Sequence, residues 1–133
     1  MKEEQTKKNS NVFLIDDDEF LLDMYALKFK NAGFGVEVAR SGEEALSKLK
    51  GGYSPDVLLL DLVMPQISGF EFLEMAKKQG FLSGVLVVVL SNLGQKEDIE
   101  KGERLGVDDY IIKANFTPSE VVEKVNSVLK NRV

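Results

Sequence analysis

Four uninterrupted apolar runs constrain the fold of this chain more than any other feature of its sequence. They are VFLI at 12–15, VLLL at 57–60, VLVVVL at 85–90 and YII at 110–112. Short apolar runs without polar alternation are typical of strands buried on both faces, which occur mainly in parallel sheets covered by helices on each side. A further segment, VEV at 36–38, alternates as a half-buried strand does. The sequence therefore predicts a five-stranded parallel sheet.

Helices are predicted between these strands, and three of them begin with a capping box. In this motif a Ser or Thr side chain and a Glu side chain three residues later each accept a hydrogen bond from the other residue's backbone N–H. The three pairs are Ser41 with Glu44, Ser68 with Glu71, and Thr117 with Glu120. Pro118 adds a first-turn proline to the last of these helices, a position that proline favours.

Two further helices are predicted from apolar spacing. The first covers 20–32, where the apolar residues Leu21, Met24, Leu27 and Phe29 have the spacing of a helix. The second covers 95–105; it has few apolar residues and contains Gly102, which costs about 1 kcal/mol relative to alanine. Strands that alternate with helices predict an α/β fold, a doubly wound five-stranded sheet flanked by five helices. We expect this domain to span residues 11–133, after a disordered polar tail at residues 1–10.

The composition excludes several classes of function. A chain of 133 residues with a net charge of −5 and no basic cluster fits one globular domain that offers no broad surface to nucleic acid or to an anionic membrane. Its longest apolar run, GVLVVVL, is too short to span a bilayer, and its first ten residues lack the apolar stretch of a signal peptide. We therefore predict a cytoplasmic protein. The absence of cysteine and histidine leaves oxygen atoms as the only strong metal ligands.

Five polar residues follow the predicted strands, at the point where each strand ends. Asp16 and Asp17 follow the first run, Asp61 the second, Ser91 the third and Lys113 the fourth. Because the carboxyl ends of parallel strands lie at one edge of the sheet, we expect these side chains to converge there. Two carboxylates about 4 Å apart repel each other by roughly 4 kcal/mol at an effective dielectric constant of 20. A shared divalent cation and the ammonium of Lys113 are expected to compensate for this repulsion.

The chemistry expected of this cluster is phosphoryl transfer. Three carboxylates without a histidine or thiolate favour a hard cation, and Mg²⁺ suits a small oxygen site that keeps several waters. Asp61 is the natural nucleophile, because an aspartate can accept a phosphoryl group as an acyl phosphate. Mg²⁺, Lys113 and Ser91 would each bind one oxygen of the transferred group. Asp18 or Glu19 is expected instead to cap the helix that follows.

Four segments together resemble the receiver domain of two-component response regulators, the CheY-like family. They are FLIDDDEF, VLLLDLVMPQISGFEF, VVVLSN and DDYIIKA, and the resemblance extends over 12–129. It is carried by an acidic pair, a D-x-x-M-P-x-x-x-G stretch that begins at Asp61, a strand-end hydroxyl and a strand-end lysine, in the order found in the family. The resemblance implies a flavodoxin-like fold with the strand order 2-1-3-4-5.

The resemblance also implies a role for each site residue. Asp61 would be the phosphoacceptor. The metal site would consist of Asp16, Asp17, Asp61 and the backbone carbonyl of Val63. Ser91 and Lys113 would contact the phosphoryl group, and Ser91 and Tyr110 would form the switch. Within the metal site, Asp17 and Asp61 would bind Mg²⁺ directly, and Asp16 would hold a metal-bound water. From the residues alone, Tyr110 is equally well explained as a core aromatic.

The partners and the class of the protein follow from the same resemblance. The phosphoryl donor would be a histidine kinase or a phosphotransfer protein, because this chain contains no histidine. An unidentified target would bind the fourth helix, the fifth strand and the last helix. We expect a regulatory domain rather than an enzyme, with self-phosphorylation and slow autodephosphorylation as its chemistry. One departure is Ala114, where the family usually has proline; a cis peptide before a non-proline residue costs about 2.5–4 kcal/mol, which argues against the family's cis peptide here.

Three alternatives share parts of this pattern. A Mg²⁺-dependent aspartyl phosphatase of the haloacid dehalogenase type also uses a strand-end aspartate, but it needs an acid two residues later, where this chain has Val63. An interaction module that works without phosphorylation would normally lack part of the acidic site, which is complete here. A flavodoxin-like FMN carrier shares the fold, but the acidic residues at 16–19 would repel a phosphate group.

Overall fold

Five parallel strands form one sheet in the order β2-β1-β3-β4-β5 in this computed structural model, which describes residues 10–131. The strands are β1 (Asn11–Ile15), β2 (Gly35–Ala39), β3 (Val57–Leu60), β4 (Leu86–Ser91) and β5 (Asp109–Ile112). The predicted number, direction and order of the strands are therefore confirmed. Of the predicted polar tail, residues 1–9 lie outside the described residues, whereas the Ser10 carbonyl accepts a hydrogen bond from the Gly35 N–H at 3.0 Å.

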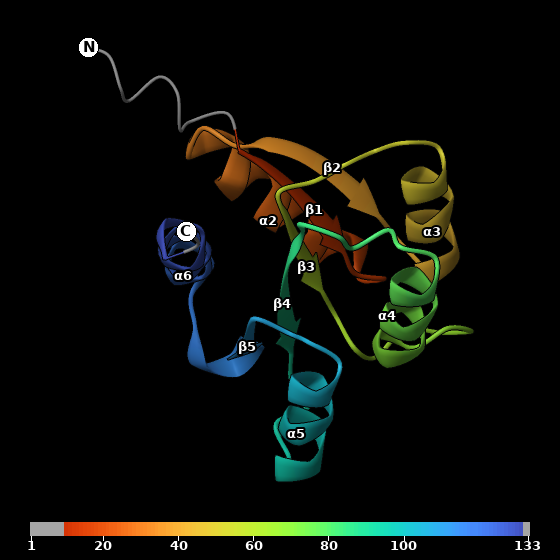
Figure 1. Cartoon of the computed structure of the whole chain (residues 1–133). Coiled ribbons are helices and arrows are strands. Elements are labelled where there is room, and N and C mark those ends of the chain that lie inside the picture. Colours follow the sequence, from red (N-terminus) through yellow and green to blue (C-terminus); the bar gives the residue numbers. More distant parts are fainter. Residues whose placement is uncertain (1–9, 132–133) are drawn as a thin grey trace.

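The helices lie in two layers, one on each face of the sheet (Figure 1). They are α2 (Glu19–Asn31), α3 (Gly42–Lys50), α4 (Gly69–Lys78), α5 (Lys96–Arg104) and α6 (Pro118–Lys130), with a short 3-10 helix, η1 (Lys113–Asn115), after β5. Helices α2 and α6 pack on one face, and α3, α4 and α5 lie on the other. The predicted α/β architecture is thus confirmed. No helix within residues 10–131 is long and apolar enough to cross a membrane.

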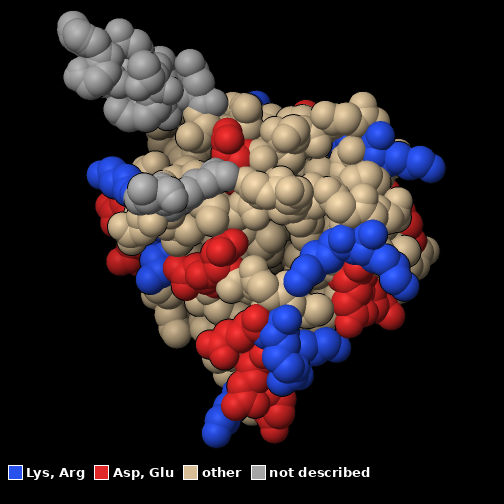
Figure 2. All heavy atoms as spheres, in the orientation of Figure 1, with Lys and Arg blue, Asp and Glu red and all other residues tan. Residues whose placement is uncertain are grey.

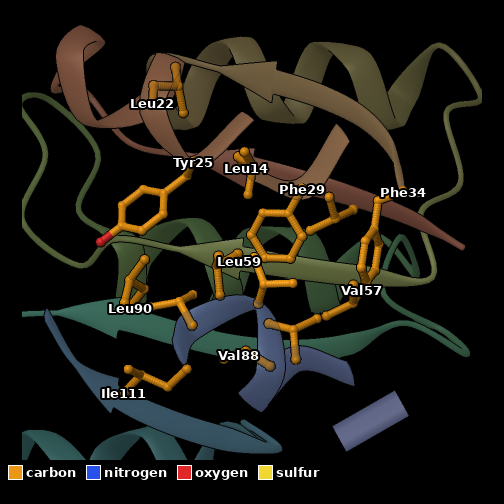
Figure 3. Close-up of a cluster of buried hydrophobic side chains, with 14 residues drawn as sticks. Leu14, Leu22, Tyr25, Phe29, Phe34, Val57, Leu59, Val88, Leu90 and Ile111 are labelled. Atoms are coloured by element: carbon orange, nitrogen blue, oxygen red, sulfur yellow. The ribbon is translucent and has the colours of Figure 1, made fainter. Parts of the chain in front are cut away.

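Successive strand residues point alternately into two hydrophobic clusters, one on each face of the sheet. In β1, Val12 and Leu14 belong to the cluster under α2 and α6, which Figure 3 shows, whereas Phe13 and Ile15 belong to the cluster under α3 and α4. Each of these four residues is at most 2 % exposed. Burial on both faces explains why the strand is an uninterrupted apolar run.

Helix α2 forms where apolar spacing predicts it, but its buried face includes only one of the four residues that gave this spacing. Its buried residues are Leu22, Tyr25 and Phe29. Of those four, only Phe29 is among them; Leu21 and Met24 are partly buried against the same cluster, and Leu27 is 59 % exposed. Apolar residues occupy most of 20–29, so two faces of the helix have the spacing expected of a buried stripe. Packing of the two buried aromatic rings against the sheet decides which face turns inward (Figure 3).

Two of the three predicted capping boxes are complete. Those at the starts of α4 and α6 form both hydrogen bonds. At the start of α3, the Ser41 hydroxyl accepts a hydrogen bond from the Glu44 N–H, but the Glu44 carboxylate accepts one from the N–H of Arg40 at 2.8 Å. The prediction for α3 was therefore wrong in one of its two hydrogen bonds, because the Glu44 side chain reaches one residue further back than a capping box requires.

Helix α5 is weakly anchored. Among the α-helices within residues 10–131 it has the fewest buried residues, Gly102 alone, and its N-terminus has no side-chain cap. Two lysines connect it to α4. The Lys101 ammonium lies 4.9 Å from the centre of the Phe70 ring, and Lys77 donates a hydrogen bond to the Leu105 carbonyl at 2.9 Å. Polar contacts at the surface thus replace much of the apolar packing that holds the other helices.

Candidate functional site

The register of the sheet places two of the predicted aspartates side by side. Ile15 and Leu60 are partners in the pairing of β1 with β3, so Asp16 and Asp61 leave adjacent strands at the same level. The Asp61 N–H donates to the Ile15 carbonyl at 2.9 Å, which extends the pairing beyond the strands. Both aspartates are buried, at 5 % and 6 % exposure. Two carboxylates therefore share one buried edge of the sheet.

Ser91 and Lys113 reach the same edge through the pairing of β4 with β5. Ser91 is the last residue of β4, one residue beyond the predicted strand, and it pairs with Ile112, directly before Lys113. Ser91 is fully buried, and the Lys113 side chain is 13 % exposed. The four predicted strand ends thus converge, as the parallel topology requires.

Lys113 is the cation that balances the buried acids. Its Nζ lies 2.9 Å from Asp16 Oδ2, with which it forms a hydrogen bond, and 3.7 Å from Asp61 Oδ2. Burial is the largest single influence on the pKa of Lys113 and would lower it. The hydrogen bond to Asp16 and the negative charges of Asp61 and Asp16 together outweigh burial, so the pKa of Lys113 is raised. The ammonium is therefore protonated at neutral pH.

The carboxyl group of Asp61 is harder to ionise than an ordinary aspartate. Burial is the main reason that its pKa is raised, and the charge of Asp16 contributes in the same direction. Lys113, the Ser91 hydroxyl and the Val63 N–H oppose this effect by favouring the ionised form. Repulsion between carboxylates, which the sequence pattern emphasised, is therefore a smaller influence on this group than its removal from water.

Three acids could hold a metal ion at this edge. Asp16, Asp17 and Asp61 each offer a carboxylate oxygen, and these oxygens lie within 4.8 Å of one another. Asp17 is exposed, whereas the other two are buried. An all-oxygen donor set of this kind fits a small hard cation such as Mg²⁺. Asp18 does not join them: its side chain accepts a hydrogen bond from the Leu21 N–H and caps α2, as predicted.

The loop between β3 and α4 brings the backbone close to Asp61. Val63, two residues beyond Asp61, is 58 % exposed. Gly69 begins α4 so close to this loop that a Cβ atom there would lie 2.5 Å from the Asp61 carbonyl oxygen and 2.7 Å from Leu62 Cα. Gln66 adopts a φ of 70°, a conformation that L-residues rarely take and that no sequence pattern predicts at this position. Glycine is therefore required at position 69 for the loop to keep Asp61 in place.

Tyr110 connects the site to α5. Its hydroxyl donates a hydrogen bond to the Leu93 carbonyl, and burial raises its pKa to about 12, so the hydroxyl keeps its proton. The Leu93 N–H in turn donates to Ser91 Oγ at 3.3 Å. The Tyr110 ring lies next to Gly102, where an added Cβ would come within 3.5 Å of it. Tyr110 is thus a partly buried aromatic that contacts both the loop after Ser91 and the weakly anchored helix.

Asn92 lies beside the site, next to Ser91, and was not predicted from the sequence. Its side-chain oxygen accepts a hydrogen bond from the Ala114 N–H at 3.0 Å, which joins the loop after Ser91 to the turn that begins at Lys113. Proline, which has no N–H, could not make this bond. The Lys113–Ala114 peptide is trans. No local pattern could have shown the bond, because its two residues belong to different strand-end loops.

Comparisons with known proteins show the family to which the chain is related. A model of the response regulator receiver domain matches residues 12–126. Among curated proteins, the chain is 35 % identical over 121 residues to a homologue of the transcriptional regulatory protein CpxR from Haemophilus influenzae. That match covers 91 % of this chain and 51 % of the relative. The chain spans about half the length of the curated relatives it matches.

Solved structures share the fold. The receiver domain of the Francisella response regulator 1452 matches with a TM-score of 0.82 at 32 % identity, covering 94 % of this chain and 100 % of that one. The chemotaxis protein CheY4 of Vibrio cholerae has the same TM-score, 0.82, at 27 % identity, covering 90 % of this chain and 98 % of that one. The family match includes every strand-end residue of the site. The chain belongs to the family of response regulator receiver domains.

Proposed function

We propose that this chain is a phosphoryl-accepting signalling switch in which Asp61 receives the phosphoryl group. The proposal is carried by the meeting of the Asp16 and Asp61 carboxylates, the Lys113 ammonium and the Ser91 hydroxyl at one buried edge. The donor would be a histidine kinase or a phosphotransfer protein. An oxygen of the Asp61 carboxylate forms the new P–O bond as the P–N bond to the donor imidazole breaks, and the electron pair of that bond stays on the imidazole nitrogen.

The neighbouring side chains would bind the oxygens of the moving phosphoryl group. Lys113 is protonated and its Nζ lies 3.7 Å from the Asp61 carboxylate, so its ammonium would take one oxygen, and the Ser91 hydroxyl would take another. The metal site would consist of Asp16, Asp17, Asp61 and the backbone carbonyl of Val63. When bound there, Mg²⁺ would neutralise charge that gathers on the phosphoryl oxygens.

A phosphatase is less well supported by this site than a switch. Turnover would need a group near Asp61 that transfers a proton or activates water. Val63 and Leu93, two positions beyond Asp61 and Ser91, are apolar and exposed at 58 % and 36 %. Both border the site without offering a polar atom on the side chain, which supports a long-lived acyl phosphate.

The proposed function is tested by phosphorylation of the wild-type chain. Acetyl phosphate, a small phosphodonor, is added with and without Mg²⁺, and the intact mass of the protein is measured. We expect the mass to rise by one phosphoryl group when Mg²⁺ is present. An unchanged mass under both conditions would contradict the proposal.

Substitution of Val63 by asparagine is expected to speed hydrolysis of the acyl phosphate by several-fold, because an amide at this exposed position can orient an attacking water. The decay of phosphorylated protein is followed by intact mass after the phosphodonor is removed. Val63→Ala is the matched control, since it shortens the side chain without adding a polar atom. Decay of Val63→Asn that is no faster than decay of Val63→Ala would show that an apolar residue at this position does not set the lifetime.

Phosphorylation is expected to change hydrogen exchange most in residues 92–106. Movement of the Ser91 hydroxyl toward a phosphoryl oxygen would remove it from the Leu93 N–H, and Leu93 is also the partner of Tyr110. Helix α5 follows directly and has little apolar packing to resist a shift. Acidic and basic side chains intermingle around it, at the bottom of Figure 2. This surface, with β5 and α6, is the proposed docking face for the target.

Mass spectrometry of exchanged amides before and after phosphorylation measures this change. The Ser91→Ala variant should still be phosphorylated but should lose much of the change in protection, because it has no hydroxyl to move. A change located mainly in α3 would place the output face elsewhere.

A further inference from the structure

Tyr25 is a buried polar residue that the acceptor site does not include. It is 5 % exposed and belongs to the hydrophobic cluster under α2 and α6. Buried tyrosine hydroxyls usually have a hydrogen-bond partner. The polar groups near this hydroxyl therefore bear on its role.

The ring of Tyr25 lies at the end of its cluster that is nearest to the acceptor site. In Figure 3 the hydroxyl points away from Phe29 and Phe34, and the ring lies beside Leu90. Leu90 directly precedes Ser91 at the carboxyl end of β4, so the hydroxyl points toward the edge where the acids converge. The pKa of Tyr25 is consistent with this direction: burial raises it most, and the charges of Lys113 and Asp16 also act on it, the first lowering and the second raising it.

A small cavity separates Tyr25 from the acids. Its volume is about 10 Å³, and its polar walls are Tyr25, Asp16 and Asp61; the remaining walls are the apolar residues Leu14, Ile15, Leu22, Leu59 and Leu90. A space of about this size holds one water molecule, and a buried water typically makes about three hydrogen bonds. The three polar side chains supply that number: a phenol that can donate, and two carboxylates that can accept.

We propose that this cavity holds one ordered water that bridges the Tyr25 hydroxyl to the Asp16 and Asp61 carboxylates, and that Tyr25 is a positioning residue of the acceptor site. The inference deepens the proposed function and rests on it for its consequence in phosphoryl transfer. The bridge restrains the two carboxylates from the core side, while Lys113 restrains them from the side of β5. Outer hydrogen bonds of this kind orient the carboxylates that hold a metal ion.

Tyr25→Phe removes the hydroxyl and keeps the ring that fills the cluster. The carboxylates then lose one restraint, and the affinity for Mg²⁺ is expected to fall by about three- to tenfold, the range expected for one net hydrogen bond. Tyr53→Phe is the matched control. Tyr53 is partly buried and packs edge-on against Phe13, but it precedes β3 and therefore lies at the opposite edge of the sheet. Its substitution should leave the Mg²⁺ affinity unchanged.

The test measures Mg²⁺ binding by calorimetry for the wild type, Tyr25→Phe and Tyr53→Phe, without a phosphodonor. A second readout uses the wild type alone, with ¹³C placed on the ring carbon that bears the hydroxyl of its three tyrosines. The Tyr25 signal should move when Mg²⁺ is added, and the Tyr53 signal should not. A purely structural role for Tyr25 would not produce this pattern.

Two results would overturn the inference. One is a Tyr25→Phe variant that binds Mg²⁺ as tightly as Tyr53→Phe does. The other is a ¹³C signal of Tyr25 in the wild type that does not move when Mg²⁺ is added. This second result applies even if the Tyr25→Phe variant fails to fold. Neither measurement uses phosphoryl transfer, so failure of the wild type to gain a phosphoryl group from acetyl phosphate would overturn the proposed function separately.

Discussion

Replacing Asp61 with asparagine is expected to reduce phosphoryl labelling by acetyl phosphate and Mg²⁺ to background. A carboxylate oxygen can attack phosphorus and form an acyl phosphate, whereas the neutral amide of asparagine is a poor nucleophile. Asparagine has nearly the same shape, so it fills the same space between Ser91 and Lys113. Intact masses of the variant and the wild type, measured after the same incubation, give the result.

The variant should remain folded, which its melting temperature checks. Because burial raises the pKa of Asp61, the ionised carboxylate is less favourable in the folded chain than in the unfolded chain. The folded chain therefore loses stability as the pH rises from the ordinary aspartate pKa through the raised one. A neutral asparagine avoids it, so Asp61→Asn should melt at the same temperature as the wild type or higher.

Two outcomes would contradict the assignment of Asp61. Equal labelling of both proteins would place the acceptor at another residue. Labelling of the wild type that resists hydroxylamine would show a phosphate ester rather than an acyl phosphate, since hydroxylamine cleaves the latter. Loss of labelling together with a lower melting temperature would instead show a damaged fold, and the loss could not then be attributed to the nucleophile.

The sheet could be predicted because local pattern and long-range pairing agree in it. A strand such as β1, which is buried on both faces, is an almost uninterrupted apolar run and is therefore recognised from its sequence. Because strands alternate with helices along the chain, a parallel sheet is the simplest arrangement. The inward face of α2 could not be predicted in the same way. Apolar residues occur around most of this helix, so Leu27 and Phe29 looked equivalent, and only packing against the sheet separates them.

The site residues could be predicted as a group because parallel strands end at one edge. That rule brings Asp16, Asp61, Ser91 and Lys113 together without any knowledge of distances. The same rule does not predict how deeply these side chains are buried. The raised pKa of Asp61 comes mainly from burial, a property of the folded molecule, and the spacing of charges in the sequence could suggest only the smaller effect of repulsion.

Contacts between separate segments of the chain escaped prediction for a related reason. Tyr25 occupies an apolar position of a helix, where a tyrosine usually fills space, and its hydroxyl becomes informative only when the cavity beside the acids is known. Asn92 is one polar residue among several in its loop, and its bond to Ala114 crosses between two strand ends. Contacts of this kind depend on the exact placement of two segments.

Replacing Asp17 with asparagine is expected to lower the affinity for Mg²⁺ by at least about tenfold, or roughly 1.4 kcal/mol, and to remove Mg²⁺-dependent phosphorylation. Asp17 is the exposed member of the three acids whose oxygens lie within 4.8 Å of one another. No ion pair among residues 10–131 includes Asp17, so the substitution leaves the contacts of Lys113 with Asp16 and Asp61 in place. The loss would therefore report on the metal alone.

Asp18→Asn is the matched control for this prediction. It removes the same negative charge from the next residue, and asparagine caps helices about as well as aspartate, so α2 should keep its N-cap. Calorimetric titration with Mg²⁺ should give nearly the wild-type affinity for Asp18→Asn and a much weaker one for Asp17→Asn. Equal affinities in the two variants would mean that Asp17 acts through net charge alone. In that case it is not a ligand, and the cation binds at the strand ends without it.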